Sequence, residues 1–289
     1  MAWGAASRAV NVLRMCWVQA RPEVQVVFAL RFAVGGLMGA QGGVLDLPGL
    51  LLGALVWACA VLAVYLVNGV SDAVEDSINK PTRPIPAGAL AASAAIRVAV
   101  AASVVASLGA LVVGVRFLGL TAAFLLLGWV YSVPPVAVKR SALGSVAVVL
   151  VGGVVTYLAG FCAAGGGELG PMLVPAVALS CWMAGVGALA KDLSDTSGDR
   201  AAGRRTLAVR WGPCRTRLVV NGNALLIGIG FFVAVLWHLP VLVLPAGVVL
   251  VGALCLAARV GAPYRVYMRT QHAAHVAAVT VLVVALIRR

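Results

Sequence analysis

Apolar runs long enough to cross a lipid bilayer recur from one end of the chain to the other. A helix needs roughly 20 mostly apolar residues to span the hydrocarbon core, because it rises about 1.5 Å per residue. Backbone polar groups have no water to bond with in the bilayer, which favours helices. Charged residues make up 11% of the chain, against about 25% in a soluble domain. We therefore predict an all-α polytopic membrane protein.

The apolar runs define about nine transmembrane helices, which we expect to form a bundle around a central apolar cavity with a polar cytoplasmic cap. The predicted spans cover approximately 23–42, 48–69, 98–115, 117–133, 143–163, 171–190, 218–237, 240–258 and 271–287. Residues 1–21 are expected to form a short surface segment, in the form of an amphipathic helix. Residues 1–289 are interpreted as a single transmembrane domain.

The basic residues indicate how the chain is oriented. Its net charge is +13, which could suggest nucleic acid as a partner. However, most Lys and Arg residues fall in alternate loops between spans, as expected when those loops face the cytoplasm. We predict a multi-pass protein of the cytoplasmic membrane, with its active site facing the cytoplasm and no nucleic-acid partner.

Six of the nine acidic residues lie in two short stretches, at 72–76 and 192–199. Residues three or four apart share one face of a helix. Asn68, Asp72 and Asp76 therefore form one oxygen-rich stripe, and the second stripe comprises Asp192, Asp195 and Asp199. Like charges on one face repel, so a solvated helix gains nothing from this pattern.

Carboxylate and amide oxygens are suitable ligands for Mg2+, which typically takes one or two carboxylates together with waters and phosphates. The pattern predicts metal ligation by the two stripes: Asn68, Asp72, Asp76, Asp192, Asp195 and Asp199. Because cationic loops follow both stripes, a diphosphate bridged by Mg2+ is the favoured ligand. The alternative is a pair of solvated helix ends with ordinary salt bridges.

Several residues near the stripes could bind the diphosphate. A loop stiffened by prolines places Lys80 and Arg83 beside the first stripe. The other candidates are Tyr131, Lys139, Arg140, Lys191 and Arg200. Each has an alternative role as a connector, an interfacial aromatic residue or a topology signal.

A charged head at the mouth of an apolar cavity suits prenyl diphosphates with tails of C10 to C20. Loss of diphosphate leaves an allylic cation, which aromatic faces can stabilise. The candidates are Trp57, Tyr65, Trp129, Tyr157 and Trp182, although core or interfacial packing is favoured for each. Arg31 places a charge at membrane depth, where it could assist the site or form a structural ion pair.

Three motifs resemble the UbiA superfamily of intramembrane prenyltransferases, which includes UbiA-type terpene cyclases. The first is Asn68-x3-Asp72-x3-Asp76 with Asn79-Lys80-Pro-x-Arg83 following. The second is Lys191-Asp192-x2-Asp195-x2-Gly198-Asp199. The third is the segment from Tyr131 through Pro134-Pro135 to Lys139-Arg140.

The resemblance implies Mg2+-dependent binding of a prenyl diphosphate by both acidic motifs, with help from Arg83 and Lys139. It implies that Asp72, Asp76, Asp192 and Lys139 carry the catalysis. In much of the family an Asp follows the first Asn of the motif, whereas this chain has Gly69.

Transfer of the prenyl group to an aromatic or other lipophilic acceptor is the favoured reaction. One alternative is cyclisation of the prenyl chain without an acceptor. A more distant alternative is an ion-coupled transporter, whose acids more often lie in the middle of a span.

Overall fold

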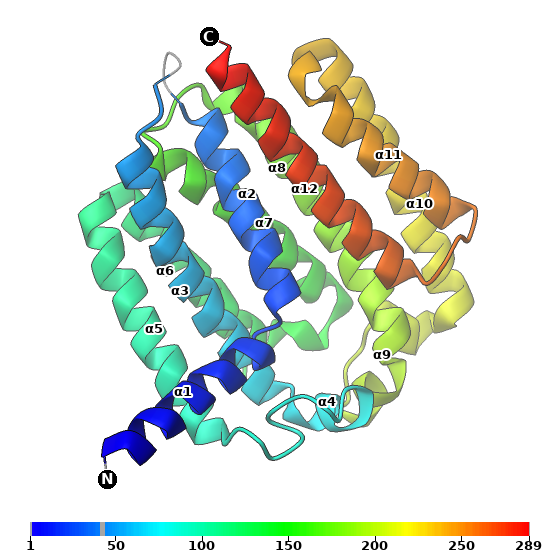
Figure 1. Ribbon diagram of the computed structural model, residues 1–289. Coiled ribbons are helices and arrows are strands. Elements are labelled where there is room, and N and C mark those ends of the chain that lie inside the picture. Colours follow the sequence, from blue (N-terminus) through cyan, green and yellow to red (C-terminus); the bar gives the residue numbers. More distant parts are fainter. Residues whose placement is uncertain (1, 41–43, 289) are drawn as a thin grey trace.

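The structure is a computed structural model that describes residues 2–40 and 44–288, with side chains from residue 7 onward. The chain forms a bundle of roughly parallel and antiparallel helices (Figure 1). The long helices are α2 (Pro22–Met38), α3 (Leu47–Ser71), α5 (Ala92–Val113), α6 (Val115–Ser132), α7 (Ala142–Ala163), α8 (Leu169–Cys181), α9 (Leu189–Ala201), α10 (Leu207–His238), α11 (Val243–Ala257) and α12 (Pro263–Ile287). The remaining segments are α1 (Ala2–Gln19), α4 (Ala73–Asn79), η1 (Val138–Arg140), η2 (Trp182–Ala188) and η3 (Pro240–Leu242).

The helical membrane architecture is confirmed. Within the described residues, 8 helical stretches are long and apolar enough to cross a bilayer. They correspond to the predicted spans from the second to the ninth. The first predicted span is α2, which has 17 residues, and its predicted end at 42 lies outside the described residues. The spans predicted at 218–237 and 271–287 begin too late, because α10 and α12 extend through the preceding basic segments.

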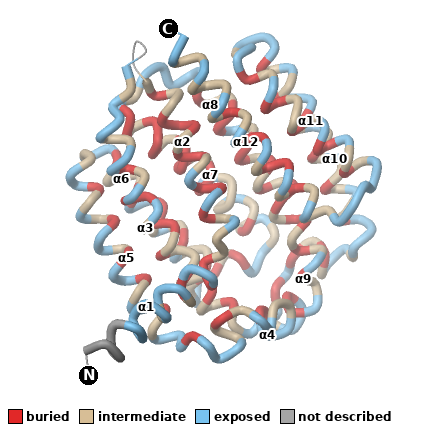
Figure 2. Tube along the Cα trace, viewed as in Figure 1, coloured by how far each residue is buried: buried red, intermediate tan, exposed pale blue. Residues whose placement is uncertain are grey.

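Glycine allows α2 and α7 to pack with their backbones in close contact. A Cβ atom at Gly35 would lie 2.0 Å from the carbonyl oxygen of Tyr157, and one at Gly160 would lie 1.9 Å from that of Phe32. Small residues permit this approach in membranes, where van der Waals packing holds helices together. Buried residues follow the interior of the bundle (Figure 2), so α2 and α7 form part of its central wall.

The predicted amino-terminal helix is present as α1, which crosses one end of the bundle (Figure 1). It exposes Val10, Leu13 and Trp17. Its last residue, Gln19, accepts a hydrogen bond from the amide of Ile85. A Cβ atom at Gly69 would lie 2.5 Å from the Gln19 side-chain nitrogen, so Gly69 faces α1.

Two helical segments depart from regular α geometry. Between α8 and α9, η2 has the wider π-helical winding, which often occurs at functional sites. In α10, Gly212 has φ 80° and is followed by Pro213, which together kink the helix. The π segment turns Met183 and Gly187 toward the interior cavity.

The contact between α2 and α7 predicts a difference between two Gly→Ala substitutions. Gly160→Ala should cost about 1–3 kcal/mol, because a rigid carbonyl occupies the space of the new methyl group. Gly222→Ala is the matched control, since nothing lies within 4 Å of its added Cβ, and it should be neutral or stabilising by up to about 1 kcal/mol. Thermal unfolding in detergent measures both, and equal melting temperatures would contradict the packing argument.

Candidate active site

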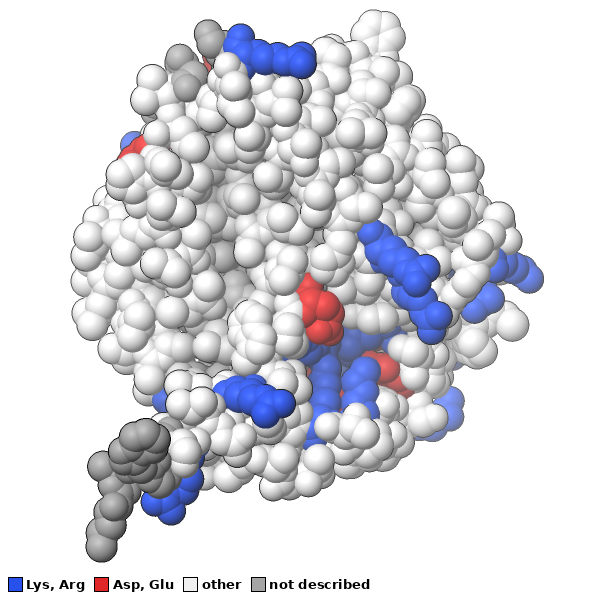
Figure 3. Space-filling model, in the orientation of Figure 1, with Lys and Arg blue, Asp and Glu red and all other residues white. Residues whose placement is uncertain are grey.

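Both acidic stretches lie at the same end of the bundle. The first occupies the end of α3 and all of α4, and the second occupies α9. Figure 3 shows Lys, Arg, Asp and Glu gathered toward the edge where α4 and α9 lie, below a broad uncharged band. Two segments more than a hundred residues apart in sequence therefore form one polar cap on an apolar body.

Asn79 joins the two stretches through the backbone. Its amide nitrogen donates to the carbonyl of Asp195 at 2.9 Å, and its amide oxygen accepts from the backbone N–H of Gly198, also at 2.9 Å. A Cβ atom at Gly198 would lie 2.4 Å from Asn79 and 2.6 Å from the carbonyl oxygen of Glu75. The glycine of the second motif thus lets α9 pack closely on α4.

The first stripe is neutralised by cations from neighbouring loops. Lys139, in η1, donates to Asp72 at 2.5 Å and to the hydroxyl of Ser71 at 2.7 Å. Arg83 forms an ion pair with Asp76. Both carboxylates are buried. This explains why η1 and the proline-rich loop pack onto the ends of α3 and α4.

Carboxylates of the second stripe also form ion pairs with basic side chains, and one of these side chains comes from the first motif. Lys80, from the first motif, contacts Asp195 at 2.7 Å, and Lys191 contacts the same carboxylate at 2.9 Å. Arg204 lies 3.2 Å from Asp199 and donates to the carbonyl of Lys139. Ordinary salt bridges at solvated helix ends do not describe this arrangement, because the acids are buried and their partners come from other elements.

Burial and ion pairing shift the pKa values of several groups at the cap. Burial acts to raise the pKa of Asp72, but the charges of Lys139 and Lys191 outweigh it and hold the pKa below its ordinary value. Burial and the nearby charge of Lys191 lower the pKa of Lys80. Burial and the charge of Asp72 raise the pKa of Glu75. Asp72 therefore remains an anion despite its burial.

Some carboxylate oxygens at the cap have no partner. Oδ2 of Asp199 is buried without a hydrogen bond, and Asp192 forms no ion pair among the described residues. Nowhere in residues 2–40 and 44–288 do three acidic, His or Cys side chains converge as a ready metal site. The two stripes supply hard oxygen donors on facing elements, and joint ligation of a metal by all six predicted residues stays a prediction.

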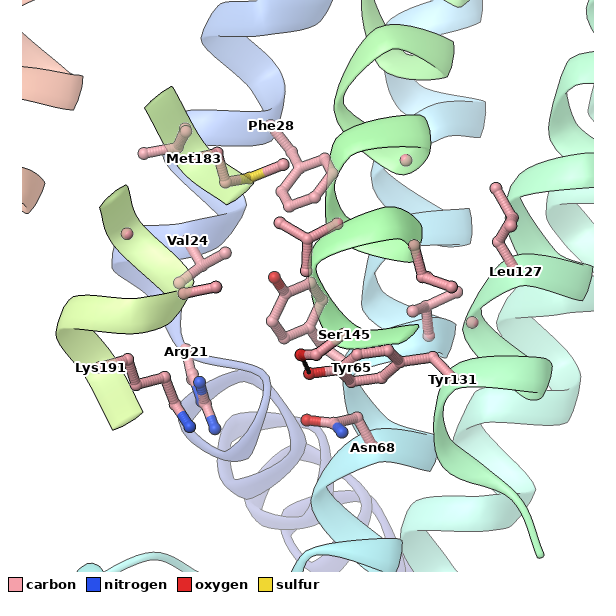
Figure 4. Close-up of a pocket in the computed structure, with 18 of the residues that line it drawn as sticks. Arg21, Val24, Phe28, Tyr65, Asn68, Leu127, Tyr131, Ser145, Met183 and Lys191 are labelled. Atoms are coloured by element: carbon pink, nitrogen blue, oxygen red, sulfur yellow. Dashed lines mark hydrogen bonds between the residues drawn. The ribbon is translucent and has the colours of Figure 1, made fainter. Parts of the chain in front are cut away.

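A cavity of about 170 Å³ runs from the polar cap into the bundle. Its polar end is lined by Arg21, Asn68, Asp72, Tyr131, Ser145, Lys191, Asp192 and Arg204. Its inner part is lined by apolar groups that include Phe28, Phe124 and Met183. Figure 4 shows Arg21, Lys191 and Asn68 at one end of this space and Phe28 with Met183 at the other. The shape and chemistry suit a molecule with an anionic head and an apolar tail.

The structure separates the predicted site residues into two groups. Asn68, Asp72, Tyr131, Lys191 and Asp192 line the cavity directly. A second group of predicted residues does not line the cavity but forms the ion pairs of the cap described above: Asp76, Lys80, Arg83, Lys139, Asp195 and Asp199. Arg140 and Arg200 are exposed and do not line the cavity, so their role in binding diphosphate stays a prediction.

Of the five aromatic candidates, Tyr65 lines the cavity. Trp57, Tyr157 and Trp182 are fully buried in packing outside it, and Trp129 is exposed. The expectation of core packing is met for Trp57, Tyr157 and Trp182, and an interfacial role for Trp129 stays a prediction. The aromatic lining is instead completed by residues that the sequence did not single out: Phe28, Phe124, Tyr264 and Tyr267.

Three polar residues of the cap were also not identified from the sequence. Arg21 precedes α2 with φ 60° and lines the cavity. Arg204 lies among seven basic residues between 191 and 217, and nothing in their spacing distinguishes it from the others. Asn79 appears in the sequence only as part of the first motif. The signal for Arg21 in the sequence is its place directly before Pro22, which is typical of a helix start.

The buried pair of Lys139 and Asp72 yields a stability prediction. Lys139→Met should destabilise the protein by about 3–5 kcal/mol, because it leaves a buried carboxylate uncompensated. Arg140→Met, one residue away and exposed, is the control and should change little. The double variant Asp72→Asn/Lys139→Met should recover most of the loss. Unfolding in detergent measures all three, and a Lys139→Met effect no larger than that of Arg140→Met would contradict the prediction.

The sequence matches known proteins over most of its length. Residues 29–285 match the UbiA prenyltransferase family. A digeranylgeranylglyceryl phosphate synthase of Korarchaeum cryptofilum (strain OPF8) is 31% identical over 194 residues, 65% of this chain and 67% of that protein. One of Halobacterium salinarum (strain ATCC 29341 / DSM 671 / R1) is 33% identical over 235 residues, 79% of this chain and 80% of that protein.

The fold matches solved structures as well. A UbiA homolog from Archaeoglobus fulgidus bound to GPP and Mg2+ superimposes with a TM-score of 0.75. The match covers 95% of this chain and 100% of the other, at 18% sequence identity. The sequence match establishes the family, and the structural match establishes the same helical architecture. The chain therefore belongs to the UbiA prenyltransferase family and is a prenyltransferase of UbiA type.

Proposed function

We propose that this enzyme binds a prenyl diphosphate with its head at the polar cap and its tail in the cavity, and transfers the prenyl group to a lipophilic acceptor. The observation that carries the proposal is the continuity of one cavity from buried acid–base pairs to an apolar interior. Lys139, Lys191 and Arg83 can donate charge-assisted hydrogen bonds to diphosphate oxygens. They would stabilise negative charge as it grows on the leaving group.

Mg2+ is the proposed metal. The donor set fits it, because the cap offers carboxylate oxygens from two facing elements, including the unpartnered Oδ2 of Asp199. Asp72 and Asp76 would hold it on one side, and the ligands on the other side would be Asp192, Asp195 and Asp199. When bound, Mg2+ would act as a Lewis acid on the departing diphosphate. The structural neighbour from Archaeoglobus fulgidus, described as bound to GPP and Mg2+, supports this assignment.

Transfer is favoured over cyclisation by the charge at the inner end of the cavity. Cyclisation moves positive charge along the prenyl chain, away from the diphosphate. Arg31 is buried and contacts Phe28 and Met183, which line the inner part of the cavity. It forms no ion pair within the described residues. A cation that migrated inward would therefore approach an uncompensated guanidinium. A cation that stays at the allylic carbon remains beside the acids of the cap, where an acceptor can attack it.

The relatives named digeranylgeranylglyceryl phosphate synthase support a lipid acceptor as one candidate class. A phenolic acceptor is the other.

The proposal predicts Mg2+-dependent release of diphosphate by the detergent-solubilised enzyme. Asp192→Asn should lower kcat by about 100-fold or more, because it removes a carboxylate ligand of the proposed Mg2+, whose Lewis acidity assists departure of the diphosphate. Glu168→Gln is the matched control, since Glu168 is an exposed acid far along the chain from either motif. Geranyl diphosphate, a membrane lipid extract and a phenolic acid serve as substrates. Equal kcat values for the two variants would contradict the proposal.

The same assay separates the possible reactions. Release only in the presence of an acceptor indicates transfer. Release without an acceptor, together with a terpene hydrocarbon or alcohol, indicates cyclisation. No release with any substrate indicates a function unrelated to prenyl diphosphates, such as transport.

We further propose that the polar cap faces the cytoplasm, because the basic loops gather there. Cys214 provides a direct test, since it is exposed in the segment of α10 that adjoins the cap. A membrane-impermeant maleimide should label Cys214 in inside-out vesicles and not in intact cells. Cys214→Ser identifies the labelled residue, and labelling of the native chain in intact cells would reverse the orientation.

A further inference from the structure

The inner end of the cavity is closed by side chains from two helical segments. Phe28 projects from α2 and Met183 from η2, at the end remote from Arg21 and Lys191 (Figure 4). The ring of Phe28 lies 5.7 Å from that of Phe124 and 5.8 Å from that of Tyr65, both edge-to-face. These contacts fix Phe28 in position.

Arg31 stands directly behind both closing residues. It lies three residues after Phe28 on the same face of α2, and its Cζ is 5.5 Å from the centre of the Phe28 ring. One guanidinium nitrogen contacts the sulfur of Met183 at 2.6 Å. Arg31 has no exposed surface and does not line the cavity. One cation thus holds the two residues that end the cavity.

Beyond this closure lie an aromatic cluster and a second, separate pocket of about 160 Å³, which borders Phe28, Phe32 and Trp57. Trp57 packs against Phe124 in a tilted arrangement with ring centres 4.8 Å apart, and Phe32 and Phe117 pack onto Trp57. An alkyl tail extending farther would have to displace the Phe28 ring, which separates the two pockets, or lie against the guanidinium. Two nitrogens of Arg31, Nε and one of the terminal pair, already lack hydrogen-bond partners. Removing the Phe28 ring or Met183 contact would leave the buried cation still less satisfied.

The depth of the cavity can be measured along its walls. The lining of α6 runs from Tyr131 to Phe124, and that of α7 from Ser145 to Gly152. Each stretch is about two helical turns, or roughly 10 Å. An extended hydrocarbon chain advances roughly 1.3 Å per carbon, given C–C bonds of about 1.5 Å. Because Tyr131 and Ser145 mark the polar end of the stretch, at most about eight main-chain carbons fit between them and the inner end. Eight main-chain carbons correspond to a geranyl group.

We infer that Phe28 and Met183, held from behind by Arg31, form a floor that limits the prenyl donor to about ten carbons. The inference rests on the proposed function and specifies its donor. The digeranylgeranylglyceryl phosphate synthases are named for a longer prenyl group, so this floor would set the present enzyme apart from them.

The test compares kcat/KM for prenyl diphosphates of C5, C10, C15 and C20 with the native enzyme and one fixed acceptor extract. The native enzyme should prefer C10 over C20 by at least tenfold. Equal kcat/KM for C10 and C20 would overturn the floor, for example if the tail leaves sideways into the bilayer. This measurement needs no variant, so it does not depend on whether a variant folds. No turnover with any donor would refute the proposed function instead.

Substitutions then locate the floor. Phe28→Ala and Met183→Ala should each raise the C20-to-C10 ratio of kcat/KM by about tenfold, because each opens the inner end. Phe117→Ala is the matched control: it removes a ring of the same cluster that does not line the cavity, and it should leave the ratio unchanged. If the native enzyme prefers C10 but neither Phe28→Ala nor Met183→Ala changes the ratio, these residues are not the floor.

Discussion

The arrangement of the polar cap depends on burying carboxylates at one end of an apolar bundle. A buried carboxylate is costly unless it is paired and hydrogen-bonded. Here the partners come from separate elements: Lys139 from η1 reaches Asp72, and Lys80 after α4 reaches Asp195 in α9. Asn79 adds a direct bond between the two acidic stretches. Because each buried carboxylate needs a cationic partner, the loops and helix ends that carry these partners pack together into one cap.

The sequence predicts those parts of the structure that local patterns determine. Apolar runs identify the helices, because the bilayer excludes other spanning structures in a chain of this kind. Spacing of three and four places the acids on common faces. It does not determine which cation pairs with which acid: Lys80 belongs to the first motif but pairs with Asp195 of the second. Such partners follow from tertiary packing, as do Arg204 and the cavity residues Tyr264 and Phe124.

Gly69 illustrates how tertiary structure explains a departure from a motif. The family resemblance leads us to expect an acid at this position, and in its absence metal binding on this side would rest on Asp72 and Asp76. In the structure Gly69 is buried against Gln19 of α1, while Asn68 lines the cavity. The position serves the packing of the surface helix on α3. The acids of the first stripe remain Asp72 and Asp76, both buried and paired.

The internal pairing of the cap has a consequence for how ligands bind. Each pair that opens supplies one anionic ligand for a metal ion and one cationic donor for a phosphate. A metal ion that bound alone would leave lysines and arginines without anionic partners. A diphosphate that bound alone would leave carboxylates without cationic partners. When both arrive together, every charge exchanges one partner for another. The affinities for metal and diphosphate should therefore be coupled, each ligand strengthening the binding of the other by the same factor.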